Sequence, residues 1–390
     1  MRQKKQIPWR SVFLALPAAA VGAALGYWGM SWADRLGGGD PLKTAGLLLA
    51  GLALAALAYF LQVTVHEGGH LVCGLLTGYR PLSFRIGRVL LVKLDGRWRV
   101  RSLHIPGTGG QCLMSPPPQE HPPYRLYHLG GGLANLLLAA LALPLCLWTQ
   151  LLPLQVFCGM LAVFGLWMAA ANLIPMKSGG IGNDGYNAKY LGKDPLAQRC
   201  LSAQLWMNAS LLEGYSLADM PKEWFALPQG ADLGNPMIAG TAMQAASRLI
   251  ALGELEEADG AVRALLARDD LLGLYRLELA GEAIYCALVL GRRREAERLY
   301  TPEVRRYWKQ TLKYDPSRVR QAYAWALLAE GDRAEGEKLR RLFEKVAARS
   351  PYTGELAGER RLLDRADQAF RASSTQDGRA EAPAQKVEKI

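Results

Sequence analysis

The chain has 390 residues, half of them hydrophobic, and a net charge of +11. This length allows two or three domains. The basic excess is not accompanied by a basic helix or an aromatic-interleaved motif, so we expect no nucleic-acid partner. Up to about residue 175 the sequence holds long runs of Leu, Ala, Val and Gly, whereas the remainder is rich in charged residues in helical patterns. This change predicts a membrane part followed by a soluble part.

After a basic N-terminus at residues 1–10, four stretches are long enough to span a bilayer, which takes about 20 apolar residues. They cover about residues 11–32, 44–78, 124–148 and 154–175. The first is also compatible with a cleaved signal peptide, because basic residues precede it and small residues offer a cleavage site. The second is longer than one span, so its end should project toward water or bend at Gly68 and Gly69.

Basic residues indicate the orientation of these spans. They gather at the N-terminus and between the second and third spans, while the other two loops are nearly balanced or uncharged. The positive-inside rule then places the N-terminus, the basic segment and everything after the fourth span in the cytoplasm, with the spans in the cell membrane. The six cysteines show no CxxC spacing. We therefore expect reduced, structural cysteines, without a disulfide framework or a cysteine zinc site.

A β-rich segment at residues 80–110 separates the second and third spans. Its sequence PLSFRIGRVLLVKLDGRWRVRSLHIPG alternates apolar and polar residues around Asp95-Gly96, which predicts a β-hairpin. Beside a membrane span, such strands must lie at the interface or be covered by protein. An exposed edge could pair with an extended peptide, or the hairpin could only pack on the core.

The second span contains the motif HEGGH in an otherwise apolar run, VTVHEGGHLVCGLLTG. His66 and His70 are four residues apart and share one helix face, so both imidazoles can reach one metal ion. Glu67 is placed to act on a bound water, and Zn²⁺ suits such ligands. The alternative is a pair of buried structural histidines, but polar groups within a span are costly and usually functional.

A catalytic zinc needs a third protein ligand and leaves one position open. The plausible donors in the chain are Glu120, His104, His121, His128 and Asp184. Three further motifs accompany HEGGH, namely GGGLAN at residues 130–135, NLIP at residues 172–175 and NDG at residues 183–185. Together, over roughly residues 44–190, these motifs resemble the site-2 protease family of intramembrane zinc metalloproteases.

The resemblance implies that His66, His70 and Asp184 bind zinc and that Glu67 is the catalytic base, with His128 as the runner-up to Asp184. In the family a broken helix returns the aspartate to the metal, whereas here the insertion MKSGGIGN requires a looped break. The resemblance also suggests that the β-rich segment forms the sheet flanking the active site. The PDZ-like and cystathionine-synthase-type modules usual in the family are not found.

Two asparagines, Asn135 and Asn172, lie at the family's asparagine positions. They are expected to contact the substrate backbone or the oxyanion, or else to tie helices together as buried amides. A second zincin class would take a glutamate as third ligand, but Glu213, Glu223 and Glu282 have no matching ExxxD-like motif.

The cytoplasmic part, residues 201–372, contains three similar segments at 251–266, 289–300 and 328–343. Each has a glycine followed four residues later by glutamate, beginning at Gly253, Gly291 and Gly331. This pattern predicts helix–turn–helix units with a period of 38–40 residues, loosely similar to tetratricopeptide repeats, although a generic helical bundle fits nearly as well. Such a domain could bind a protein partner or be a passive appendage. The tail at 373–390 is expected to be disordered.

We therefore expect a mainly α polytopic membrane protein with about four transmembrane helices and a small β-hairpin or sheet, followed by a cytoplasmic helical, repeat-like domain. Residues 11–200 would form the membrane metalloprotease domain. The expected function is hydrolysis of peptide bonds in membrane-embedded protein or peptide substrates by a zinc-activated water. The alternative is a catalytically inert membrane-anchored scaffold that binds a partner through its repeats. A transporter is less favoured, because the spans show no internal symmetry.

Overall fold

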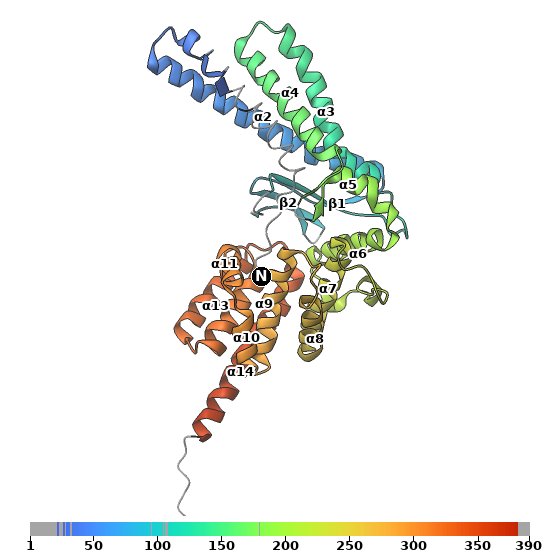
Figure 1. Cartoon of the computed structure of the whole chain (residues 1–390), viewed down its shortest axis with the longest axis vertical. Helices are drawn as coiled ribbons and strands as arrows, with labels where there is room; N and C mark the ends of the chain where they lie inside the picture. The colour runs from blue at the N-terminus through green and yellow to red at the C-terminus, as the bar shows by residue number, and fades with distance from the viewer. Residues whose placement is uncertain are drawn as a thin grey trace, which may run out of the picture. The chain divides into compact units, whose positions relative to one another are not determined.

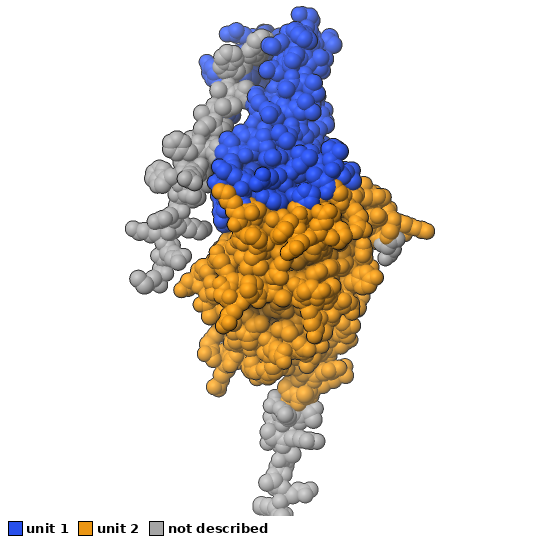
Figure 2. Space-filling view, turned by 90° about the vertical axis from the view of Figure 1, so that its right-hand side faces the viewer, with its two compact units in different colours: residues 1–77, 123–190 blue, residues 78–122, 191–390 orange. Residues whose placement is uncertain are grey.

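The computed structural model describes residues 22, 26–27, 29–31, 33–94, 96–103, 105, 108–178 and 180–380, with side chains to residue 373. Most of the first expected span, residues 11–32, therefore lies outside the described residues. The chain divides into two compact units, which Figure 2 colours separately. The first unit comprises residues 1–77 and 123–190, and the second comprises residues 78–122 and 191–390.

The first unit contains three long helices among its described residues (Figure 1). They are α2 (Pro41–Leu76), α3 (Arg125–Trp148) and α4 (Leu152–Leu173), and each is long and apolar enough to cross a membrane. These helices correspond to the second, third and fourth expected spans. Many of their leucines are exposed, for example Leu49 at 68%, Leu137 at 62% and Leu147 at 70%, as lipid-facing side chains would be.

Helix α2 begins at Asp40, whose carboxylate accepts hydrogen bonds from the backbone of Leu42 and Lys43 and so caps the helix. It then runs unbroken for 36 residues, about 54 Å at 1.5 Å per residue. Of the two alternatives expected for this long span, a projecting end or a bend at Gly68 and Gly69, the helix shows no interruption at these glycines.

Gly69 is required at its position because α2 approaches α3 closely there. A Cβ at Gly69 would lie 2.2 Å from the carbonyl oxygen of Gly130, and a Cβ at Gly130 would lie 2.4 Å from that of Gly69. The two helix backbones are thus in direct contact, as small residues allow in membrane helix pairs. About three turns along α2 and α3 from this contact, α4 packs on both helices through a cluster of small and apolar side chains: Ala58, Ala142, Cys158, Leu161 and Ala162.

The second unit contains a four-stranded antiparallel sheet in the order β3-β2-β1-β4. Its strands are β1 (Arg80–Ile86), β2 (Val89–Leu94), β3 (Arg97–Ser102) and β4 (Gly110–Ser115). Strands β2 and β3 pair from Leu94 with Arg97, and Gly96 has φ 75°, which confirms the predicted hairpin. Asp95 itself lies outside the described residues. The first arm of the predicted hairpin is divided into β1 and β2, and β4 lies almost entirely beyond the β-rich segment predicted at residues 80–110.

The sheet groups with the C-terminal helices, whereas the sequence placed the β-rich segment in the membrane domain at 11–200. The reason is the apolar face of β2. Leu90, Val92 and Leu94 are buried in one cluster with Leu212, the last residue of helix α6 (Pro195–Leu212).

The remaining elements of the second unit are helical (Figure 1). They are η1 (Leu191–Lys193), η2 (Leu217–Asp219), η3 (Lys222–Trp224), α7 (Pro236–Leu252), α8 (Leu255–Leu266), α9 (Gly273–Val289), α10 (Arg293–Leu299), α11 (Pro302–Thr311), α12 (Pro316–Ala324), the π-turn η4 (Trp325–Ala329), α13 (Arg333–Ala347) and α14 (Thr353–Ala380).

The three glycines of the predicted repeats lie in the turns between paired helices. Gly253 separates α7 from α8, Gly291 separates α9 from α10, and Gly331 separates η4 from α13. Their φ angles are 85°, 77° and 69°, a region that glycine adopts without steric cost. The predicted helix–turn–helix units are therefore confirmed. Helix α14 continues to Ala380, so the segment expected to be disordered from residue 373 begins as helix; residues 381–390 lie outside the described residues.

Candidate metal centre

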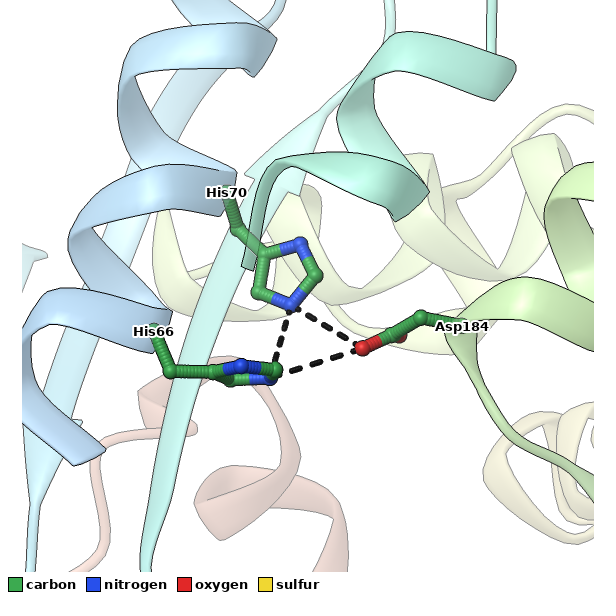
Figure 3. Close-up of side chains that lie close together, drawn as sticks. All are labelled: His66, His70 and Asp184. Atoms are coloured by element: carbon green, nitrogen blue, oxygen red, sulfur yellow. Dashed lines mark hydrogen bonds and ion pairs between the residues drawn. The ribbon is translucent and has the colours of Figure 1, made fainter. Parts of the chain in front are cut away.

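Helix α2 places His66 and His70 one turn apart on the same face (Figure 3). Both histidines are buried, each with 8% exposure, and their Nε2 atoms lie 3.2 Å apart. Two imidazole nitrogens that face each other so closely cannot both present lone pairs without repulsion, unless a proton or a metal ion lies between them.

The other nitrogen of each imidazole is held by helix α3. His66 Nδ1 lies 2.7 Å from Asn135 Oδ1, and His70 Nδ1 lies 2.8 Å from the backbone oxygen of Tyr127. A backbone carbonyl can only accept a hydrogen bond, so His70 Nδ1 must donate and His70 Nε2 carries the lone pair. This is the arrangement that orients a histidine as a metal ligand.

Asp184, the first residue of helix α5 (Asp184–Tyr190), supplies the third group (Figure 3). Its Oδ2 lies 3.4 Å from His66 Nε2 and 3.3 Å from His70 Nε2. Burial raises the pKa of Asp184, but the adjacent side chains of His66 and His70 outweigh burial and hold this pKa below the usual range, so the carboxylate is ionised. Ligand atoms of all three residues lie within 4.8 Å of one another.

A small hairpin explains how Asp184 reaches the histidines despite the long insertion. Strands β5 (Lys177–Ser178) and β6 (Ile181–Gly182) pair antiparallel, with Gly180 at φ 90° in their turn. The hairpin folds the extra residues back on themselves. The backbone N–H of Asn183 then donates to the oxygen of Met176, and the chain returns to the end of α4.

The side chain of Asn183 fixes this return. Its Nδ2 donates to the backbone oxygens of Ala171 and Ile174, both at 2.7 Å, at the end of α4. Its Oδ1 accepts from the backbone N–H groups of Met176, at 3.0 Å, and Tyr186, at 2.9 Å. One amide thereby ties α4, the hairpin and α5 together directly beside Asp184.

The three residues fit a metal ion in both chemistry and space. Two imidazole nitrogens and one carboxylate oxygen are ligands typical of Zn²⁺ and related transition-metal ions. Gly131 on α3 leaves the space open, because a Cβ there would lie 2.5 Å from His70 Nε2 and 2.7 Å from His66 Nε2. His66, His70 and Asp184 could therefore hold a metal ion.

Glu67 directly follows His66 on α2 and is buried, with 8% exposure. Among the described residues, the other donors considered from the sequence do not join the cluster. His128 is buried on α3, with its ring next to those of Tyr124 and Tyr127. Glu120 and His121 belong to the second unit, and His104 lies outside the described residues.

The glutamates considered for a different zincin class also lie in the second unit. They are Glu213, Glu223 and Glu282. Glu282 instead binds the guanidinium of Arg320 through both carboxylate oxygens at 2.8 Å.

The two asparagines differ in their surroundings. Asn135 is fully buried and binds His66 through its oxygen and Gln62 through its nitrogen. It thus links α2 to α3, as expected of a buried amide that ties helices together. Asn172 is half-buried, and its Nδ2 donates to the backbone oxygen of Met168 one turn earlier in α4.

Sequence reasoning missed three residues of the site: Gln62, Gly131 and Asn183. A signal for Gln62 was available, because it lies four residues before His66 and must share the face of both histidines. Asn183 precedes the aspartate in NDG, and Gly131 is the second glycine of GGGLAN. Neither motif indicates which backbone groups Asn183 binds or that Gly131 faces the histidines.

No protein-family model, curated protein or solved structure matches the chain. The resemblance to the site-2 protease family therefore rests on the four sequence motifs.

Proposed function

We propose that the chain is an intramembrane zinc endopeptidase of the site-2 protease type. The observation that carries this proposal is the convergence of His66 Nε2, His70 Nε2 and Asp184 Oδ2, with Gly131 leaving space beside the two imidazole nitrogens. Two of these ligands belong to α2, which is long and apolar enough to cross a membrane. A hydrolytic site on such a helix would act on peptide bonds in or near the bilayer.

When bound, a zinc ion polarises a carbonyl group and lowers the pKa of a water molecule to about 7. His66, His70 and Asp184 would hold the ion, and Asn135 and Tyr127 orient the two imidazoles behind it. Glu67 would take a proton from the attacking water and deliver it to the leaving amine nitrogen. The new bond joins the water oxygen to the scissile carbon, and the C–N bond breaks.

The proposed substrates are membrane-embedded proteins or peptides. The backbone of a transmembrane helix is fully hydrogen-bonded, so the segment to be cut must first unwind. The basic segments argue for a cytoplasmic second unit, and its paired helices could recruit a protein partner.

The first test measures metal in the purified full-length protein by elemental analysis. The wild type should retain about one zinc per chain, and Asp184→Ala should lose it. Glu67→Gln should keep the metal, because Glu67 is not among the three converging ligands. A wild type that binds no transition metal at all would refute the proposal.

The second test compares the membrane proteome of cells expressing the wild type with that of cells expressing Glu67→Gln. Loss of the general base should slow cleavage by about 10² to 10⁴-fold, so intact substrates should accumulate with the variant. The inert scaffold predicts identical proteomes. Identical proteomes from a Glu67→Gln protein that still binds zinc would therefore favour the scaffold.

A further inference from the structure

A chain of buried amide groups leads from His66 away from the metal ligands and ends on α4. Asn135 and Gln62 are both 0% exposed. Asn135 Oδ1 lies 2.7 Å from His66 Nδ1, and Asn135 Nδ2 lies 2.7 Å from Gln62 Oε1. Gln62 Nε2 in turn lies 2.8 Å from the backbone oxygen of Leu161. The chain thus connects α2, α3 and α4 through side chains alone until it reaches a backbone group.

The directions of these hydrogen bonds follow from two backbone oxygens, which can only accept: that of Leu161 and that of Gln62 itself. The oxygen of Leu161 can only accept, so Gln62 must turn its NH₂ toward it and its oxygen toward Asn135. Asn135 must then turn its NH₂ toward Gln62, where it also meets the backbone oxygen of Gln62 at 2.8 Å. Its own oxygen therefore faces His66, and His66 Nδ1 must carry the proton.

The opposite orientation of Asn135 would disable the ligand. If its NH₂ faced His66, Nδ1 would have to accept, and the proton of the neutral imidazole would move to Nε2. A protonated Nε2 has no lone pair to offer to a metal ion. The orientation of one amide thus decides whether His66 can bind metal.

We propose that Gln62 is a positioning residue of the metal site, which fixes the orientation of Asn135 and through it the metal-binding tautomer of His66. This inference rests on the proposed function in that a metal ion is bound at His66, His70 and Asp184.

Helix α4 provides the space that the Gln62 amide occupies, as well as the Leu161 oxygen that accepts its hydrogen bond. A Cβ at Gly165 would lie 2.4 Å from Gln62 Nε2 and 2.9 Å from both Ala139 Cβ and the backbone oxygen of Asn135. Alanine at this position must push the Gln62 amide away from Leu161. Gly165→Ala therefore perturbs the amide chain from a helix that supplies none of the three ligands.

Three variants and one control separate positioning from packing. Gln62→Met keeps the length of the side chain and removes both of its hydrogen bonds, so that only the backbone oxygen of residue 62 still accepts from Asn135. Gln62→Glu, neutral at this buried position, keeps an oxygen that accepts from Asn135 and has an O–H that donates to the Leu161 oxygen. Gly165→Ala displaces the amide. The control Leu161→Ala truncates a buried side chain of the same helix contact but retains the backbone oxygen that accepts from Gln62.

The experiment uses the purified full chain in detergent, stripped of metal and titrated with Zn²⁺ against a chromophoric chelator. Partners behind metal ligands typically contribute 10–100-fold to affinity. Gln62→Met and Gly165→Ala should weaken Zn²⁺ binding by this factor, while Gln62→Glu should recover most of it and Leu161→Ala should bind as the wild type does. With saturating Co²⁺, the visible spectrum of Gln62→Met should also shift, which a loss of packing alone would not produce.

The outcomes distinguish this inference from the proposed function. A wild type without metal affinity overturns both. A wild type that binds Zn²⁺, together with folded Gln62→Met or Gly165→Ala protein of unchanged affinity and spectrum, overturns the role of Gln62 and leaves the protease proposal standing. If Gln62→Met does not fold, Gly165→Ala is compared with Leu161→Ala, and equal weakening of Zn²⁺ binding by these two variants would assign the effect to packing. Gln62→Glu then provides the second test, because it should bind Zn²⁺ nearly as the wild type does.

Discussion

Replacing Gly131 with alanine should weaken metal binding by more than about 100-fold while α2, α3 and α4 stay packed. The added methyl carbon would lie 2.5 Å from His70 Nε2 and 2.7 Å from His66 Nε2, the two nitrogen atoms that would bind the ion. Ordinary contact begins at 3.4 Å, so the two imidazoles would have to retreat by about 0.9 and 0.7 Å, the differences between 3.4 Å and these distances.

These displacements are large compared with what a metal site tolerates. Zinc–nitrogen bonds are about 2.0–2.1 Å long, and a competent site keeps them within about 0.2 Å. Because both imidazoles are displaced at once, the loss should exceed the 10–100-fold effect of residues behind the ligands, so we expect more than 100-fold weaker Zn²⁺ binding. The assay is competition with a chromophoric chelator on the purified, metal-free chain.

A matched control lies within HEGGH itself. A Cβ at Gly68 would meet no atom within 4 Å, so Gly68→Ala should bind Zn²⁺ as tightly as the wild type. Alanine also has the higher helix propensity, by up to about 1 kcal/mol, so α2 should not be weakened. Wild-type zinc affinity in a folded Gly131→Ala protein would refute the assignment of this space to the metal.

Three further predictions concern the return loop, the bound metal and the second unit. Asn183→Ala removes four hydrogen bonds beside Asp184 and should weaken Zn²⁺ binding about 10–100-fold in the same titration. An unchanged affinity would mean that the β5–β6 hairpin alone holds the loop. Adding Zn²⁺ at 100 times its Kd should stabilise the wild type by about 2.7 kcal/mol in thermal unfolding and leave Asp184→Ala unaffected. Burial, reinforced by the charges of Glu359 and Asp315, raises the pKa of Glu355 to about 8. The folded state therefore favours the protonated carboxyl, and this stabilisation, complete below about pH 4, is lost as the pH rises to 8. Glu355→Gln should have the same unfolding temperature as the wild type at pH 4. At pH 8 it should unfold at a higher temperature, because its free energy of unfolding should exceed that of the wild type by at least about 1.4 kcal/mol, the equivalent of one unit of pKa. Equal unfolding temperatures at pH 8 would contradict this prediction.

The elements that the sequence predicted well depend on local patterns. The lengths of the apolar runs indicated α2, α3 and α4, and the alternation around Asp95-Gly96 indicated the β2–β3 hairpin. The turn glycines Gly253, Gly291 and Gly331 have positive φ angles, which is a property of the residue itself.

Pairing between distant segments was not predictable in the same way. Strand β1 pairs with β4, although β2 and β3 lie between them in the sequence. Arg85 on β1 is only 1% exposed. Arginine in a strand normally indicates a solvated position. Here its guanidinium donates to the backbone oxygens of Gly87 and Gly110, and the Gly110 oxygen reaches it only once β1 has paired with β4.

The candidate metal site shows the same division. His66 and His70 follow from a spacing of four residues on one helix, but Asp184 is 114 residues beyond His70 and came from the resemblance of motifs. The sequence could indicate that the insertion must loop. It could not indicate that β5 and β6 would pair, or that Asn183 would bind both sides of the break, because these contacts depend on where α4 ends.

Gln62 is a residue of the site that the helical pattern alone could have identified. Positions 62, 66 and 70 are spaced by four, so all three polar side chains lie on one face of an otherwise apolar helix. A buried amide without partners is costly, and in a membrane no water can satisfy it. A glutamine kept one turn from a metal ligand must therefore bind other buried polar groups, and Asn135, five residues after Gly130 at the contact with α2, is the nearest such group on α3. The same periodicity that identifies the two histidines thus also identifies the residue that orients one of them.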